Sequence, residues 1–146
     1  MAAKKLNIKT VIYCDDQEAP AQIHADEFIF GDYKDKIKIQ EFINKVDVVT
    51  YEFENIPFET LDLISQFKQV KPKPGINKIV QHRLYEKDFI NKCNINTTRY
   101  VSIQKKADLN SNIKLIPALL KTCRLGYDGK GQYTLNSLSD LKNLKI

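Results

Sequence analysis

The first seventy residues alternate between strand-like and helix-like segments, and this order constrains the fold more than any other feature of the chain. β-Branched and apolar residues predict strands at 10–14, 27–30, 46–51 and around Val70. A helix end is expected at 1–6, and apolar spacing predicts helices from about Asp35 and from Pro57. Alternating strands and helices indicate a parallel sheet with helices on its faces. We therefore expect an α/β fold.

The helix that begins at Pro57 has a well-defined apolar stripe. Its members are expected to be buried against the sheet, and they are Phe58, Leu61, Ile64 and Phe67.

The pattern changes after segment 71–75, Lys-Pro-Lys-Pro-Gly, which is the best linker in the chain. We place a domain boundary there, with one domain over 1–73 and a second over 74–146. In the second half, periodicity predicts a long helix through about Lys92, a weaker one at 107–113 and another after Ser137. Strands are predicted at 99–103, 117–122 and 132–135.

Composition argues against several classes of protein. The three cysteines lie far apart and neither histidine has a Cys or His partner at metal-ligand spacing, so neither a disulfide framework nor a zinc site is expected. The net charge of +5 comes from scattered lysines, which does not favour nucleic-acid binding. No apolar run is long enough for a membrane span or a signal core, so a cytoplasmic location is expected.

Polar side chains gather in residues 51–55, the acidic loop, which follows the strand predicted at 46–51. They are Tyr51, Glu52, Glu54 and Asn55. Parallel sheets bind ligands at the carboxyl ends of their strands, so this loop is a candidate part of a binding cleft. The alternative is a capped loop that faces solvent.

Three of the five glycines in the chain lie in residues 126–132, the glycine-rich loop between two predicted strands. Glycines let a backbone approach a ligand closely, and successive N–H groups form a nest for anions such as phosphate. Lys121 and Lys130 add positive charge. The loop does not match GxxxxGK[ST], because Gln132 follows Gly131. It is therefore either a flap over phosphates or a flexible hairpin turn.

Leu120-Lys121 and segment 124–132, Arg-Leu-Gly-Tyr-Asp-Gly-Lys-Gly-Gln, resemble the ATP-grasp signature of the 5-(carboxyamino)imidazole ribonucleotide synthases. Segments 48–57 and 81–87 are also similar to that family, so the resemblance covers essentially the whole chain. It implies an ATP-dependent ligase of purine synthesis, in which bicarbonate is phosphorylated and its carboxylate passes to 5-aminoimidazole ribonucleotide. It also implies Mg²⁺ as a cofactor, although nothing in this chain matches the family's metal ligands, and it implies homodimers.

The resemblance also implies site residues. Contacts to the ATP phosphates are expected from Arg83, Lys121, Gly126, Tyr127, Asp128, Gly129, Lys130, Gly131 and Gln132. The acidic loop is expected near the substrate cleft, and no catalytic residue is assigned.

The family's first strand and its Gly-Gly-Gly-Gln-Leu-Gly-Arg loop have no counterpart here. The expected architecture is an incomplete parallel-sheet pre-ATP-grasp domain without its first strand, followed by the N-terminal part of an ATP-grasp domain. Such a chain is expected to be a fragment with little activity alone. Two alternatives stay open: another ATP-grasp ligase, such as biotin carboxylase or formate-dependent glycinamide ribonucleotide transformylase, and a non-catalytic remnant or interaction domain.

Overall fold

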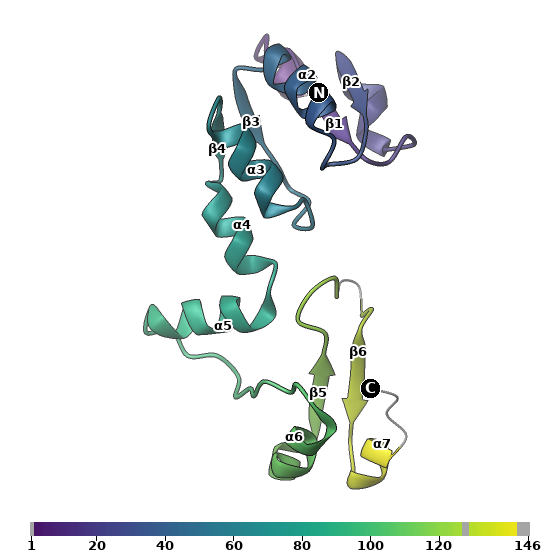
Figure 1. The fold of residues 1–146 in the computed structure, drawn as a ribbon, viewed down its shortest axis with the longest axis vertical. Helices are drawn as coiled ribbons and strands as arrows, with labels where there is room; N and C mark the ends of the chain where they lie inside the picture. Colours follow the sequence, from purple (N-terminus) through teal and green to yellow (C-terminus); the bar gives the residue numbers. More distant parts are fainter. Residues whose placement is uncertain (1, 127–128, 143–146) are drawn as a thin grey trace. The chain divides into compact units, whose positions relative to one another are not determined.

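A computed structural model describes residues 2–126 and 129–142 of the chain (Figure 1). The chain divides into two compact units, Met1–Lys78 and Ile79–Ile146. The domain boundary expected between residues 73 and 74 stays a prediction, because helix α4 (Pro74–Val80) runs across the division between the units. No helix in the described residues has the length and apolar character needed to cross a bilayer.

The first unit contains the four strands expected from its sequence and the helices expected from about Asp35 and from Pro57, together with a 3-10 helix that was not expected. In chain order its elements are α1 (Ala2–Lys5), β1 (Val11–Cys14), the 3-10 helix η1 (Pro20–His24), β2 (Glu27–Phe30), α2 (Lys36–Lys45), β3 (Val48–Thr50), α3 (Phe58–Ser65), β4 (Gln69–Lys71) and α4. The start of α2 has a local cause. Asp35 caps α2, because its Oδ1 accepts hydrogen bonds from the Ile37 and Lys38 amides at 2.9 and 3.1 Å.

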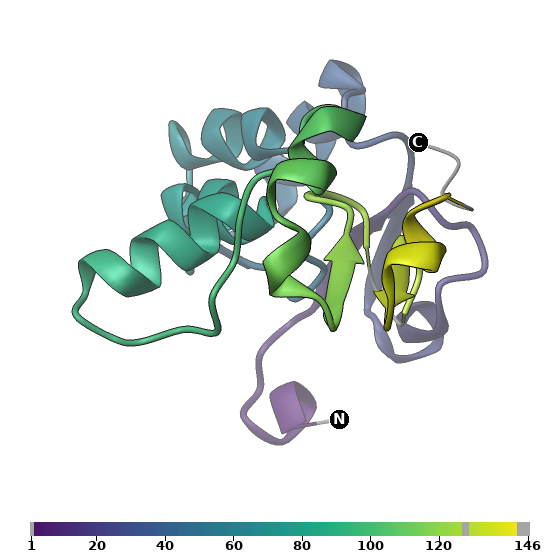
Figure 2. The same cartoon turned by 90° about the horizontal axis from the view of Figure 1, so that it is seen from below.

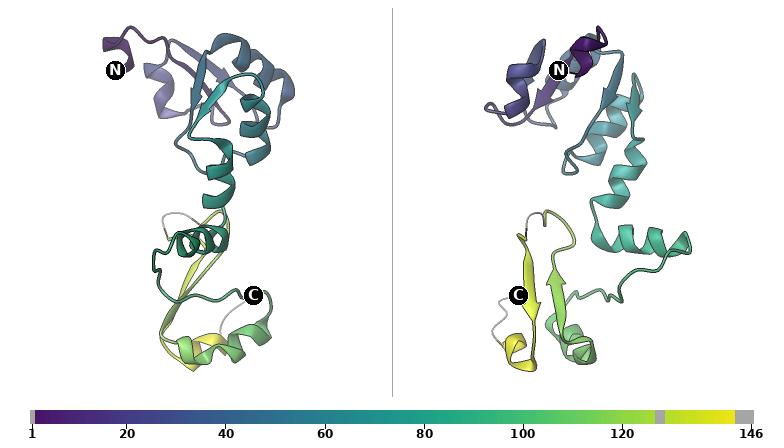
Figure 3. Two further views of the ribbon diagram at one scale, coloured as in Figure 1. Left: turned by 90° about the vertical axis from the view of Figure 1, so that its left-hand side faces the viewer. Right: turned by 180° about the vertical axis from the view of Figure 1, so that it is seen from behind.

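The strands of the first unit form two parallel pairs, which confirms the expected α/β fold with parallel strands (Figure 3). β1 pairs with β2, with Val11 opposite Glu27, and β3 pairs with β4, with Val49 opposite Val70. Among the described residues, these pairs are separate two-stranded sheets. Both pairs and the helices α2 and α3 nevertheless contribute to one apolar core.

The core of the first unit consists of apolar side chains that are nearly inaccessible to solvent: Ile29, Ile39, Phe42, Ile43, Val49, Leu61, Ile64 and Val70. Burial of each such side chain contributes about 2 kcal/mol. The expected stripe of α3 is correct at Leu61 and Ile64 but wrong at Phe67, which is 57% exposed. The reason is that α3 ends at Ser65, so residue 67 no longer follows the helical period.

The second unit contains α5 (Arg83–Lys92), α6 (Lys106–Ser111), the 3-10 helix η2 (Ile113–Leu115), β5 (Ala118–Lys121), β6 (Gln132–Leu135) and α7 (Leu138–Lys142). β5 and β6 form an antiparallel hairpin (Figure 2). Figures 1 and 3 show α6 and α7 at the end of this hairpin opposite the glycine-rich loop. A small core of Leu109, Leu135 and Leu141 lies there.

Two predictions for this half are wrong. The long helix through Lys92 is two helices, α4 and α5, because the Arg83 amide donates to the Cys123 carbonyl at 3.0 Å rather than continuing α4. The segment 99–103 is not a strand. Its composition suits a strand, but a strand requires a hydrogen-bonded neighbour, and the only pair in the described part of this unit is β5 with β6.

Candidate phosphate-binding site

The β5–β6 hairpin positions most of the predicted phosphate-binding residues at one end. Lys121 is the last residue of β5 and lies opposite Gln132, the first residue of β6. The Thr122 amide donates to the Gly131 carbonyl at 2.8 Å and closes the connection. Gly126, Gly129, Lys130 and Gly131 lie within it, and the predicted site residues Tyr127 and Asp128 lie outside the described part of the chain.

Two glycines of this loop lie close to a neighbouring side chain. Gly131 has φ +64°, and a Cβ there would lie 2.4 Å from Thr122 Oγ1. A Cβ at Gly126 would lie 2.8 Å from the same oxygen. Both residues therefore pass close to the Thr122 side chain, a contact that composition alone could not reveal. Within the described part of the loop, Gly126 and Gly131 allow both of its sides to approach Thr122.

Arg83 joins the glycine-rich loop from the start of α5. Its Nη2 donates to the Gly126 carbonyl at 2.5 Å, and its own amide donates to Cys123. The guanidinium group has five N–H donors in a planar fork, so one bond to the loop leaves others for an anion. The structure thus brings together two parts of the predicted site that are far apart in the sequence.

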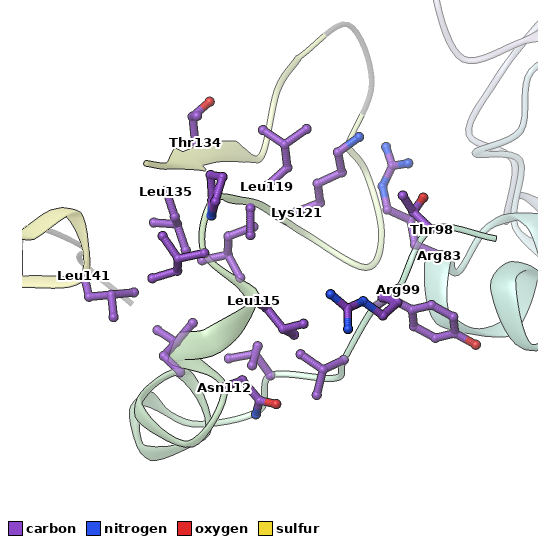
Figure 4. Close-up of a pocket in the computed structure, with 18 of the residues that line it drawn as sticks. Arg83, Thr98, Arg99, Asn112, Leu115, Leu119, Lys121, Thr134, Leu135 and Leu141 are labelled. Carbon is purple, nitrogen blue, oxygen red and sulfur yellow. The ribbon is translucent and has the colours of Figure 1, made fainter. Parts of the chain in front are cut away.

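A pocket of about 690 Å³ lies beside these residues in the second unit (Figure 4). Its wall is apolar along β5, from Pro117 to Leu120. Among the described residues that line it, the charged ones are Arg83, Glu86, Lys87, Arg99 and Lys121. Four cations against one carboxylate favour an anionic ligand, and an apolar wall favours a flat ring beside it.

Sequence reasoning missed Arg99 as a residue of this pocket. It lies in the segment wrongly predicted as a strand, and Figure 4 shows its side chain among the residues that line the pocket. A single arginine in a β-branched segment carries no pattern that distinguishes a pocket residue from a surface residue, so the sequence held no signal for it.

The acidic loop lies in the first unit, directly after β3. Glu52 and Glu54 are exposed, while Tyr51 and Asn55 are half-buried. Burial raises the pKa of Tyr51, and a hydrogen bond from the Asn77 backbone partly offsets that shift. The loop is held on the neighbouring segment, because Tyr51 Oη donates to the Lys73 carbonyl at 3.5 Å. The role expected for these four residues stays a prediction.

No group of three or more His, Cys, Asp or Glu side chains in the described residues has the arrangement needed to hold a metal ion. No described residue is therefore assigned to the Mg²⁺ that the family resemblance implies, and no chemical step is assigned to that ion.

Family models match both halves of the chain. Residues 1–81 match the ribonucleotide synthetase preATP-grasp domain, and residues 88–145 match the ATP-grasp domain.

Known relatives agree with these matches. The chain is 38% identical over 144 residues to the bifunctional purine synthesis protein purC/E of Dictyostelium discoideum, covering 97% of this chain and 14% of that protein. It is 39% identical over 118 residues to the N5-carboxyaminoimidazole ribonucleotide synthase of Pseudomonas aeruginosa, covering 80% of this chain and 33% of that protein.

A solved structure shares the fold. The Staphylococcus aureus N5-carboxyaminoimidazole synthetase, solved with ADP, superposes with a TM-score of 0.91 at 30% identity, covering 97% of this chain and 39% of that one. The chain thus spans well under half of each of these relatives. The resemblance to the 5-(carboxyamino)imidazole ribonucleotide synthases is confirmed, and the chain belongs to the ribonucleotide synthetase family defined by the preATP-grasp domain.

Proposed function

We propose that this chain is the ATP-phosphate-binding part of an N5-carboxyaminoimidazole ribonucleotide synthase. The observation that carries the proposal is the contact between Arg83 and Gly126, which joins a cation to the glycine-rich loop in the segment that matches the ATP-grasp domain. The reaction would consume ATP, bicarbonate and 5-aminoimidazole ribonucleotide. A cytoplasmic location and assembly as a homodimer belong to the same proposal.

Charge stabilisation is the proposed role of this site. Arg83 and Lys121 would bind the phosphate oxygens of ATP, and the backbone N–H groups of residues 126–132 would cover them, including Tyr127 and Asp128. When the terminal phosphoryl group passes to bicarbonate, negative charge spreads over its oxygens. Fixed cations and backbone N–H groups stabilise that charge without reorganising. The ADP bound by the Staphylococcus aureus relative supports this choice of nucleotide.

The acidic loop would serve the other substrate. The aminoimidazole ring carries an exocyclic amine and the ribose carries hydroxyls, and all of these donate hydrogen bonds. Glu52, Glu54 and Asn55 offer acceptor oxygens at the carboxyl end of β3, where open parallel sheets bind ligands. Because the chain spans 33% of the Pseudomonas aeruginosa relative, turnover by this chain alone is expected to be weak.

A binding titration tests the proposal. Calorimetry with ATP and the 146-residue chain should give saturable binding, and Lys121→Ala should weaken it by roughly tenfold, the value of one charge-assisted hydrogen bond. Lys114→Ala is the matched control, because Lys114 is exposed on η2 and is not among the residues that line the pocket. Absence of ATP binding, or equal effects of the two variants, would refute the proposed phosphate site.

A second titration tests the substrate. Binding of 5-aminoimidazole ribonucleotide, with none of glycinamide ribonucleotide, is the expected result. The reverse preference would assign the chain to a different ATP-grasp ligase.

A further inference from the structure

The acidic loop is attached at both of its ends to residues 73–77, where α4 begins. At the far end, Asn77 Nδ2 donates to the carbonyl of Ile56, the residue that follows the loop, at 2.9 Å. At the near end, Tyr51 Oη donates to the carbonyl of Lys73, the residue that precedes α4, at 3.5 Å. Both ends of the loop are therefore held beside the start of one helix.

Asn77 is an unusual residue for its position. Its side chain is only 1% exposed, the least accessible polar side chain described in the molecule. Its Nδ2 faces the Ile56 carbonyl, which fixes the orientation of the amide, since a flip would place two oxygens together. Its Oδ1 is buried and has no hydrogen-bond partner among the described residues.

A buried acceptor without a partner lowers stability, and an apolar side chain of similar size would avoid that loss. Stability of the core thus gives no reason for asparagine at position 77. The bond from Nδ2 to the loop does give one, because no leucine or valine can donate to a carbonyl.

We propose that Asn77 is a positioning residue, which holds the acidic loop on α4 so that Glu52, Glu54 and Asn55 meet 5-aminoimidazole ribonucleotide in a fixed geometry. The choice of ligand rests on the proposed function, whereas the attachment of the loop does not. Asn77 itself would not touch the ligand, because its side chain is buried and points from α4 to the Ile56 carbonyl.

Hydrogen exchange tests the attachment without any ligand. In Asn77→Leu, amides of the acidic loop should exchange about fivefold faster, the factor that corresponds to one net hydrogen bond. Amides of β3 and β4, such as Val49 and Val70, should keep their rates. Global stability should stay equal or rise, since the unpaired Oδ1 is removed. Unchanged loop exchange, or equal acceleration throughout the unit, would overturn the proposal.

Two further variants keep this test decisive. Asn77→Ala removes the amide without adding bulk, and it replaces the leucine variant if that one does not fold. Asn44→Leu is the matched control, because Asn44 lies exposed on α2 and bonds only to Gln40 of the same helix, at 3.0 Å, among the described residues. It should leave the exchange of the acidic loop unchanged.

Ligand affinities test the positioning role. Asn77→Leu should weaken binding of 5-aminoimidazole ribonucleotide by about fivefold and leave ATP affinity unchanged. Equal loss of both affinities would indicate general destabilisation and refute the role. If the wild-type chain binds ATP but no 5-aminoimidazole ribonucleotide, the proposed substrate and the positioning for it both fail, while the exchange rates still decide whether Asn77 holds the loop.

Discussion

Two loops of this molecule follow the carboxyl ends of strands, and they are held in different ways. The acidic loop after β3 contains no glycine, and side-chain hydrogen bonds from Tyr51 and Asn77 fasten it. The glycine-rich loop after β5 contains three glycines and is closed mainly at its backbone, by Thr122 to Gly131 and by Arg83 to Gly126. The first arrangement leaves side chains exposed for a ligand. The second is held through backbone groups, which suits the proposed recognition of phosphate by backbone N–H groups.

The strongest test of this contrast replaces a glycine. Gly131→Ala should destabilise the second unit by about 3 kcal/mol, since alanine at a positive φ is strained and its Cβ would overlap Thr122. Urea denaturation measures this loss. Gly75→Ala is the control, because nothing lies within 4 Å of a Cβ there and α4 should gain about 0.5–1 kcal/mol. Equal effects at both positions would mean that the close approach to Thr122 does not shape the loop.

The next test concerns the cation that joins α5 to the glycine-rich loop. Arg83→Lys keeps the charge but loses the planar fork that bonds to Gly126 and leaves further donors for phosphate. ATP affinity should fall about tenfold, as measured by calorimetry. The same change at Arg124, which is exposed and is not among the residues that line the pocket, should have little effect. An unaltered affinity in Arg83→Lys would show that charge alone is sufficient.

A smaller effect is expected from the cap of α2. Asp35→Ala removes the acceptor for the Ile37 and Lys38 amides and should cost about 1 kcal/mol of stability. Thermal unfolding should report the loss, and ATP affinity should not change at 25 °C, where the protein stays folded. A change in ATP affinity comparable to that of Arg83→Lys would contradict the assignment of nucleotide binding to the second unit.

The smallest expected effect concerns how acid changes the stability of each unit through one exposed carboxylate. Hydrogen bonds from Lys45 and Lys9 lower the pKa of Glu27 to about 2, from an ordinary value of 4.5. Its contribution to stability is complete above pH 4.5 and is lost as the pH falls towards 2. In the second unit, hydrogen bonds from the Gln104 and Lys105 amides also lower the pKa of Asp108.

Salt distinguishes these two cases. At 1 M salt the Glu27 contribution should shrink, because exposed ion pairs are screened, whereas the capping bonds to Asp108 should be less affected. Denaturation of Glu27→Gln and Asp108→Asn at pH 6 and pH 3, with and without salt, measures both. Identical salt responses would show that the two carboxylates are stabilised in the same way.

The sequence was a good guide wherever the cause of a structure is local. β2 was expected at 27–30 and α2 from Asp35, and both occur there, because apolar and aromatic residues and a helix cap act over a few positions. It failed where the cause is distant. The carbonyl of Cys123 separates α5 from α4, and segment 99–103 is not a strand because strands need partners that composition cannot supply.

The candidate site likewise contains residues that the sequence identified and residues that it missed. Glycine clustering identified the glycine-rich loop, and the family resemblance added Arg83, which the structure brings to Gly126. Thr122 and Asn77 were missed. Their importance lies in what they contact, since a threonine after a strand and an asparagine in a helix are ordinary in sequence.

The separation of β1–β2 from β3–β4 has a consequence for handling the protein. Each of these four strands is paired on one side only within the described residues, so each has a row of backbone donors and acceptors without a strand partner. Such rows recruit strands from other molecules. We therefore expect aggregation to increase steeply with protein concentration, and crystallisation or NMR work on this chain should begin from dilute stocks.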